Sequence, residues 1–120
     1  MEESKKNLIL EQTFNFTLRI IEFCEKLEEN KKYIVAKQLL KSGTSIGANI
    51  REAQYAESKL DFVHKMKIAE KEANETEYWL LLCKQAKNYP FEEDLFNQLS
   101  SIIKVLSKII TTSKSNIASN

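Results

Sequence analysis

The chain has 120 residues, of which 42% are hydrophobic and 29% charged, a composition typical of one globular domain and not of a disordered chain. Its 18 basic and 17 acidic residues leave a formal net charge of +1, which argues against a globally basic nucleic-acid-binding protein. Only two glycines and one proline are present, so the turns of a sheet-rich fold are unsupported and helices are favoured.

The first predicted helix covers residues 8–28 and carries apolar side chains on two faces. The face that we expect to line the core consists of Leu10, Phe14, Leu18 and Ile21. The second face, roughly opposite, consists of Ile9, Phe16, Ile20, Phe23 and Leu27. A peripheral bundle helix needs one apolar face, so we interpret the second as a subunit interface. The alternative is a helix that is buried on both sides of an irregular bundle.

A second helix is predicted over residues 32–56, after a short polar turn at residues 29–31. Its apolar seam keeps a 3-4 spacing for more than two heptads and consists of Ala36, Leu39, Gly43, Ile46, Ile50 and Ala53. Residues 42–47 (SGTSIG) superficially resemble a phosphate-binding loop but lack its Gly-Lys-Ser/Thr ending. We therefore expect Gly43 and Gly47 to let a neighbouring helix approach closely.

Two further helices complete the pattern. Ser58 is predicted to cap a third helix over residues 59–87, with Asp61 forming a capping box. The seam of this helix consists of Phe62, Met66, Ala69, Ala73, Thr76, Leu80 and Cys83. Residues 88–90 (NYP) end the third helix, because the residue before proline avoids helical backbone angles. Acidic residues at 92–94 open the fourth helix. The fourth apolar arc consists of Leu95, Leu99, Ile102, Leu106 and Ile109.

Helices of this length joined by short turns predict an all-α fold, an antiparallel up-down-up-down four-helix bundle. We expect one domain over residues 1–120, with an ordered core from about 8 to 112 and a frayed tail at 113–120.

A polar seam accompanies the apolar seam of the second helix, displaced by about 90° at 100° per residue. It consists of Gln38, Ser42, Ser45, Asn49 and Glu52, with a counterpart on the third helix in Glu70, Asn74 and Glu77. Two interpretations stay open: a solvated face, or a hydrogen-bonded seam between helices or subunits.

Positive charge is concentrated on the second helix. Residues 31–51 contain five basic residues and no acidic one. Lys37, Lys41 and Arg51 fall within an arc of about 80° opposite the apolar seam. This stripe could contact RNA phosphates without reading sequence. The alternative is a solvated helix face whose charge is partly cancelled by Glu52 and Glu57.

The residues that usually carry catalysis or bind metals are scarce. His64 is the single histidine, which excludes a ferritin-like di-iron site and leaves too few ligands for zinc. We expect His64 on the surface, and Cys24 and Cys83 as buried free thiols. We therefore predict no catalytic residue, metal ligand, cofactor site or small-molecule site.

Nothing in the sequence favours a membrane or a secretory pathway. The longest apolar run, residues 79–83, is far shorter than the ~20 residues that cross a bilayer. Residues 1–6 lack the layout of a secretory signal. We expect a cytoplasmic protein.

Two motifs resemble a known family: KSGTSIGANIREA at residues 41–53 and EANETEYWL at residues 72–80. These motifs and their spacing are similar to the bacterial four-helix bundle family encoded in intervening sequences of 23S ribosomal RNA genes, sometimes labelled a ribosomal protein. The resemblance covers about residues 8–112, and one departure is Lys41, where an arginine is common.

This resemblance implies a cytoplasmic bundle with no known catalytic activity, often assembled as a ring-like homopentamer. A related protein, the accessory subunit of diversity-generating retroelements, is similar in fold and binds nucleic acid and a reverse transcriptase, although it is typically more basic. The first hypothesis is thus a non-catalytic, oligomeric module associated with RNA or a ribonucleoprotein. The second is an oligomeric protein–protein scaffold without a nucleic-acid role, and the third is an enzyme or ligand carrier, for which the sequence shows no pocket.

Overall fold

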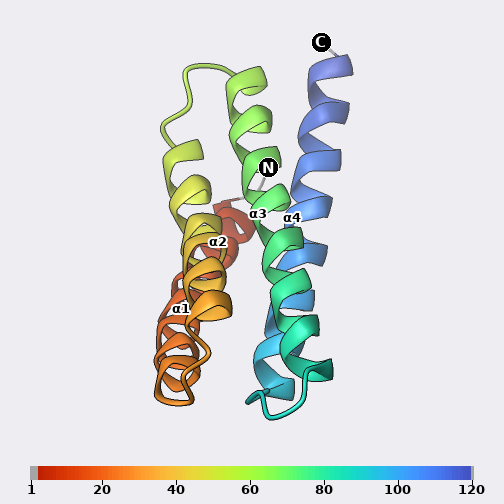
Figure 1. Cartoon of the computed structure of the whole chain (residues 1–120). Helices are drawn as coiled ribbons and strands as arrows, with labels where there is room; N and C mark the ends of the chain where they lie inside the picture. Colours follow the sequence, from red (N-terminus) through yellow and green to blue (C-terminus); the bar gives the residue numbers. More distant parts are fainter. Residues whose placement is uncertain (1–2, 120) are drawn as a thin grey trace.

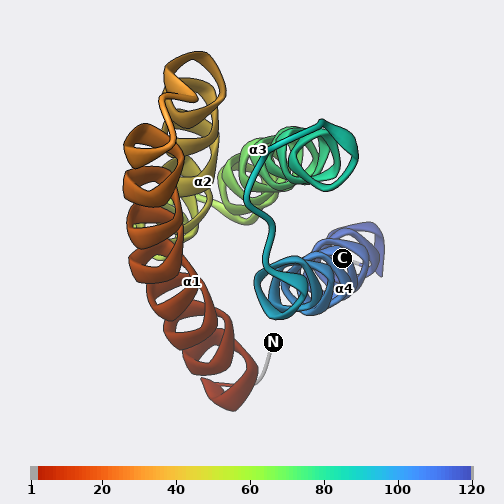
Figure 2. The ribbon, with the colours of Figure 1, turned by 60° about the horizontal axis from the view of Figure 1, so that its bottom comes forward.

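Four helices make up the computed structural model, which describes residues 3–119. They are α1 (Glu3–Glu29), α2 (Tyr33–Ala53), α3 (Lys59–Gln85) and α4 (Glu93–Ser119). Consecutive helices run in opposite directions (Figure 1), and α1 also packs against α4, which closes the bundle. In the tilted view of Figure 2, α2 lies between α1 and α3, and α4 lies beside α3. The predicted all-α, up-down-up-down bundle is confirmed.

Local signals determine where the helices begin and end. Ser58 caps α3 as predicted, because its side chain accepts a hydrogen bond from the backbone N–H of Asp61 at 3.0 Å. Lys31 follows α1 with a positive φ of 62°, and the next N–H, of Lys32, donates to the carbonyl of Leu27 at 2.8 Å. Asn88 has a φ of 65° in the turn after α3, a conformation that asparagine tolerates well.

The predicted seams of α2 and α4 are buried at every position, and they meet in one apolar core. The α3 seam is also buried, except that Phe62 is half-buried and packs against the edge of the core. The two glycines of α2 lie against α1. A Cβ on Gly43 would come within 2.8 Å of Ile20 Cγ2, whereas one on Gly47 would keep at least 3.4 Å from its nearest neighbour. Close helix approach, predicted for both glycines, is confirmed at Gly43, whereas Gly47 leaves room for a side chain.

The two faces of α1 were assigned the wrong way round in the sequence analysis. The face predicted to be a subunit interface is fully buried in the core of this chain and consists of Ile9, Phe16, Ile20, Phe23 and Leu27. The face predicted to line the core points outward, with Phe14, Leu18 and Ile21 exposed and Leu10 half-buried.

A physical reason for this orientation is visible in the sequence. The buried face continues through small side chains at Thr13 and Cys24 to the last turn, so it fills the whole helix length. The other face runs into Glu25 and Glu28, and burying it would also desolvate carboxylates without partners. The continuous seam, which also contains Phe16 and Phe23, is therefore the face that is buried.

The end of the chain differs from the prediction as well. Residues 113–119 continue α4 as helix, so the frayed tail predicted from residue 113 is wrong over this range, and residue 120 lies outside the described residues. Ile110 is buried and Ile117, two turns later, packs against the core. These contacts stabilise the end of α4 over residues 113–119, although its polar sequence alone predicted fraying.

Candidate nucleic-acid interface and subunit contact

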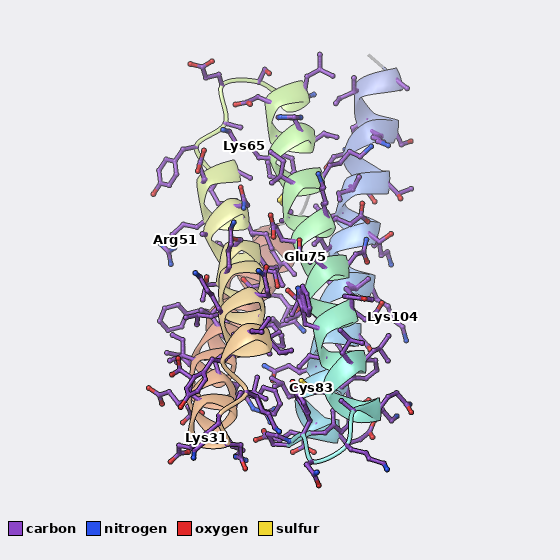
Figure 3. The ribbon with its side chains drawn as sticks, viewed as in Figure 1. Lys31, Arg51, Lys65, Glu75, Cys83 and Lys104 are labelled. Carbon is purple, nitrogen blue, oxygen red and sulfur yellow. The ribbon has the colours of Figure 1, made fainter. Side chains whose placement is uncertain are left out.

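The outer face of α2 carries the predicted basic stripe. Lys37, Lys41 and Arg51 are all exposed, because the opposite side of the same helix contributes the buried seam. Arg51 points away from the bundle, on the side opposite Lys104 of α4 (Figure 3). No ion pair among the described residues includes any of the three stripe cations. Their charges therefore face solvent.

One of the two acidic residues expected to weaken this stripe, Glu52, is engaged elsewhere. Glu52 Oε1 accepts a hydrogen bond from Lys65 Nζ of α3 at 3.0 Å, and Asp61 lies 3.9 Å from the same nitrogen. The hydrogen bond that Lys65 donates to Glu52 is also the main reason why the pKa of Lys65 is raised. The charge of Glu52 is thus balanced by Lys65, whereas Glu57 is exposed and forms no ion pair among the described residues.

Two exposed tyrosines extend the same stripe, and the sequence analysis missed them. Tyr33 lies one turn before Lys37, and Tyr55 lies one turn after Arg51. The stripe follows the spacing 33, 37, 41, 44, 48 and 51 along the outer face of α2, and Tyr55 comes four residues later, in the turn after the helix ends. The sequence signal that could have identified both tyrosines is this 4-4-3-4-3-4 spacing, in which no position is acidic.

Beside the stripe, α1 presents an apolar ridge made of Phe14, Leu18 and Ile21. Phe14 is 58% exposed and Leu18 is 50% exposed. The ridge borders a groove of about 240 Å³ between α1 and α2, lined by Leu10, Thr13, Phe14, Thr17, Thr44, Gly47, Ala48 and Arg51. Three large side chains in successive turns form a contiguous apolar surface of the kind that marks interaction sites.

The polar seam of α2 is hydrogen-bonded to α3 at two positions, the buried Ser42 and the exposed Glu52. Ser42 and Thr76 are both buried, and Thr76 Oγ1 donates to Ser42 Oγ at 2.9 Å. The hydrogen-bonded interpretation is therefore correct at these two positions only, and the bond between Ser42 and Thr76 joins the two sequence motifs.

The other seam residues have different roles. Ser45 and Asn49 donate to carbonyls of their own helix, and Gln38 is half-buried. The predicted α3 counterpart, which consists of Glu70, Asn74 and Glu77, is not joined to α2 by any hydrogen bond or ion pair among the described residues. These three lie about 100–160° around α3 from Thr76, the residue that faces α2. The counterpart therefore does not face α2 within the subunit, because periodicity alone does not reveal which side of α3 meets α2.

A polar network ties α1 to the start of α4. Glu92 accepts hydrogen bonds from Lys26 Nζ at 2.7 Å and from Arg19 Nη2 at 3.2 Å, and Arg19 Nη1 donates to Gln98 Oε1 at 3.0 Å. The hydrogen bond from Lys26 is the largest cause that holds the pKa of Glu92 below its ordinary value. This network positions the α3–α4 connection against α1.

The thiols are free and buried as predicted, at Cys24 and Cys83. Burial raises the pKa of Cys24 to about 12 and that of Cys83 to about 11, so both stay protonated at neutral pH. Within residues 3–119, no cluster of histidine, cysteine or acidic side chains could hold a metal ion. His64 is exposed as predicted. No described helix is both long enough and apolar enough to span a bilayer.

Comparison with known proteins identifies the family. The sequence profile of the 23S rRNA-intervening sequence proteins matches residues 5–112. The crystal structure of a protein of unknown function from the S23 ribosomal protein family of Bacteroides thetaiotaomicron is 44% identical in sequence, with a TM-score of 0.84. The alignment covers 89% of this chain and 98% of the other. Among curated proteins no match was found. The chain belongs to the family of 23S rRNA-intervening sequence proteins.

Proposed function

We propose that this chain is a non-catalytic, cytoplasmic RNA-binding module that acts as an assembly of several copies. The observation that carries RNA binding is the outer face of α2, where Lys37, Lys41 and Arg51 are exposed together without an ion-pair partner among the described residues. Three unpaired cations along one helix suit the regularly spaced phosphates of a nucleic-acid backbone.

Self-association rests on the α1 ridge of Phe14, Leu18 and Ile21. A second copy is the partner that the proposal assigns to this ridge, and the family resemblance suggests five copies. Assembly would repeat the basic stripe around the complex, so several weak contacts would act on one RNA molecule. Multivalency of this kind compensates for the modest net charge of +1 on each copy.

A non-catalytic role is supported by the state of the reactive side chains. The two thiols are buried with raised pKa values, and the single histidine lies on the surface. A nucleophile and base would have to meet in a water-excluding pocket, and neither residue type offers that pairing.

RNA binding is tested by a titration of labelled RNA at low and moderate salt. The variant Lys37→Glu/Lys41→Glu/Arg51→Glu should lose affinity steeply. The slope of log Kd against log salt should fall by about 2, since each lost contact with single-stranded RNA contributes about 0.7. The matched control is Lys104→Glu/Lys108→Glu/Lys114→Glu, which makes the same charge change on α4 and should bind more tightly than the stripe variant. Equal affinity of wild type and stripe variant would contradict the proposal.

Assembly is tested separately by light scattering at micromolar concentration. Wild type should give a multiple of 13.9 kDa, and Phe14→Ser/Leu18→Ser should give the single-chain mass. Leu60→Ser is the control, because it removes an exposed apolar side chain from α3. A wild-type mass near 13.9 kDa would refute self-association.

A protein–protein scaffold is the second candidate function. It is favoured by further exposed apolar side chains on α3, at Tyr78, Leu81 and Leu82. These would serve a protein partner better than an RNA backbone. An assembled protein that binds no RNA would leave this candidate in place of the first.

A further inference from the structure

The two tyrosines at the ends of the α2 stripe differ from the other tyrosines in the chain. Of the four tyrosines, Tyr78 packs edge-on against Trp79 with centroids 5.3 Å apart, and Tyr89 lies under Lys32 Nζ at 4.8 Å. Within the described part of the chain, no side-chain hydrogen bond or ring contact engages the rings of Tyr33 and Tyr55. Tyr33 is 60% exposed and Tyr55 is 81% exposed.

One exposed tyrosine on a protein surface needs no explanation. Here two free rings bracket three unpaired cations: Tyr33 begins α2, and Tyr55 lies in the turn two residues after α2 ends at Ala53. The surface between Tyr33 and Arg51 is open, because Thr44 and Ala48 are small and no acidic residue occurs between positions 33 and 51. At 1.5 Å per residue, the helical part of the path, from residue 33 to residue 53, is about 30 Å long.

An extended nucleic-acid strand has the chemistry that this path would recognise. Phosphates suit the cations, and the flat faces of unpaired bases suit the exposed aromatic rings. Bases within a duplex are already stacked on one another, so they cannot reach rings that lie on a convex helix face. Free tyrosines therefore add affinity for a single strand and none for a duplex.

We propose that the α2 outer face binds single-stranded RNA, with Tyr33 and Tyr55 stacking on bases at either end of the path. Lys37, Lys41 and Arg51 contact the phosphates between them. The inference rests on the proposed RNA-binding function, and it adds the conformation of the RNA and two residues that contact it.

The experiment measures fluorescence anisotropy of labelled oligouridine of roughly 12 nucleotides, within the ~4–16 nucleotides that such sites occupy. A hairpin duplex and a single-stranded oligothymidine, each of similar length, are titrated in parallel. The variant Tyr33→Ala/Tyr55→Ala should bind oligouridine at least about tenfold more weakly, since one stacked base contributes ~1–3 kcal/mol. Its affinity for the hairpin should equal that of wild type.

Two matched controls separate stacking from general damage. Tyr33→Phe/Tyr55→Phe keeps both aromatic faces and should keep the wild-type affinity for oligouridine. Tyr78→Ala removes an exposed tyrosine from α3 and should also bind normally. Circular dichroism of each variant should match wild type, because the substituted rings lie outside the core.

The possible failures are distinguishable. If Tyr33→Ala/Tyr55→Ala binds oligouridine as wild type does, while the charge-reversed stripe variant does not, stacking is wrong and the proposed function stands. If the stripe variant binds as wild type does, the proposed function itself is wrong. Equal weakening of hairpin and oligouridine binding by the tyrosine variant would refute single-strand preference. Oligothymidine binding as tight as oligouridine binding would refute the commitment to RNA.

Discussion

Thr76 of α3 donates a buried hydrogen bond of 2.9 Å to Ser42 of α2, and this bond joins the two motifs by which the family can be recognised. Thr76→Val keeps the side-chain shape but leaves the buried Ser42 hydroxyl without its α3 partner. We expect the free energy of unfolding to fall by about 1–3 kcal/mol. The double variant Thr76→Val/Ser42→Ala should lose less free energy of unfolding than the sum of the losses in the two single variants. Urea unfolding of wild type, both single variants and the double variant measures this coupling. Strict additivity would contradict it.

The two glycines of α2 should respond in opposite ways to alanine. In Gly43→Ala the new Cβ would meet the branched, buried side chain of Ile20 at 2.8 Å, so we expect a loss of about 1–3 kcal/mol. In Gly47→Ala the new methyl group would make ordinary contacts, and the better helix propensity of alanine should offset or exceed any cost by up to ~1 kcal/mol. The melting temperature of Gly47→Ala should therefore lie well above that of Gly43→Ala.

The orientation of α1 is tested by two phenylalanines two residues apart. Phe16 is fully buried, so Phe16→Ala should cost about 3–5 kcal/mol and leave the protein marginal or unfolded. Phe14→Ala removes an exposed ring and should change the stability of the single chain little. Circular dichroism melts at several concentrations separate chain stability from association. The reverse ranking would mean that α1 is rotated.

Acid should weaken the contact between α1 and α4. The pKa of Glu92 is lowered from its ordinary value of 4.5, chiefly by the hydrogen bond from Lys26. A carboxyl group with a lowered pKa contributes stability above the unfolded value and loses it as the pH falls through the folded value. The urea midpoint of Glu92→Gln should thus lie slightly below that of wild type at pH 7, and the gap should close below about pH 4.5. The gap should be small, because solvent screens this partly exposed network.

Thiol reactivity should report unfolding. Because burial raises the pKa of Cys24 to about 12 and that of Cys83 to about 11, the native protein should react very slowly with an aromatic disulfide reagent at pH 8. Both thiols should react rapidly in denaturant. Fast modification of the folded protein would mean that the core around Cys24 and Cys83 opens readily.

Much of the fold could be predicted from periodicity and end signals. The seams through Ile46 on α2 and Leu99 on α4, and the cap at Ser58, follow from local spacing and local hydrogen bonding. The exposed basic stripe was also predictable, since it lies opposite a clear apolar seam. Charge and burial on one helix are set by residues within a few turns of each other.

Other features depended on contacts between distant segments. The sequence of α1 contains two apolar faces, and only packing against α2 and α4 determined that Phe16 is buried and Phe14 exposed. The partner of Ser42 was likewise decided by the rotation of α3, which placed Thr76 opposite it. The sequence by itself therefore determined the helices, their order and the outward stripe, whereas the tertiary structure decided which of two similar faces turned inward. The physical reason is that helical periodicity defines the angles between side chains around each axis, but the rotation of each helix is set by the total burial and desolvation of the whole bundle.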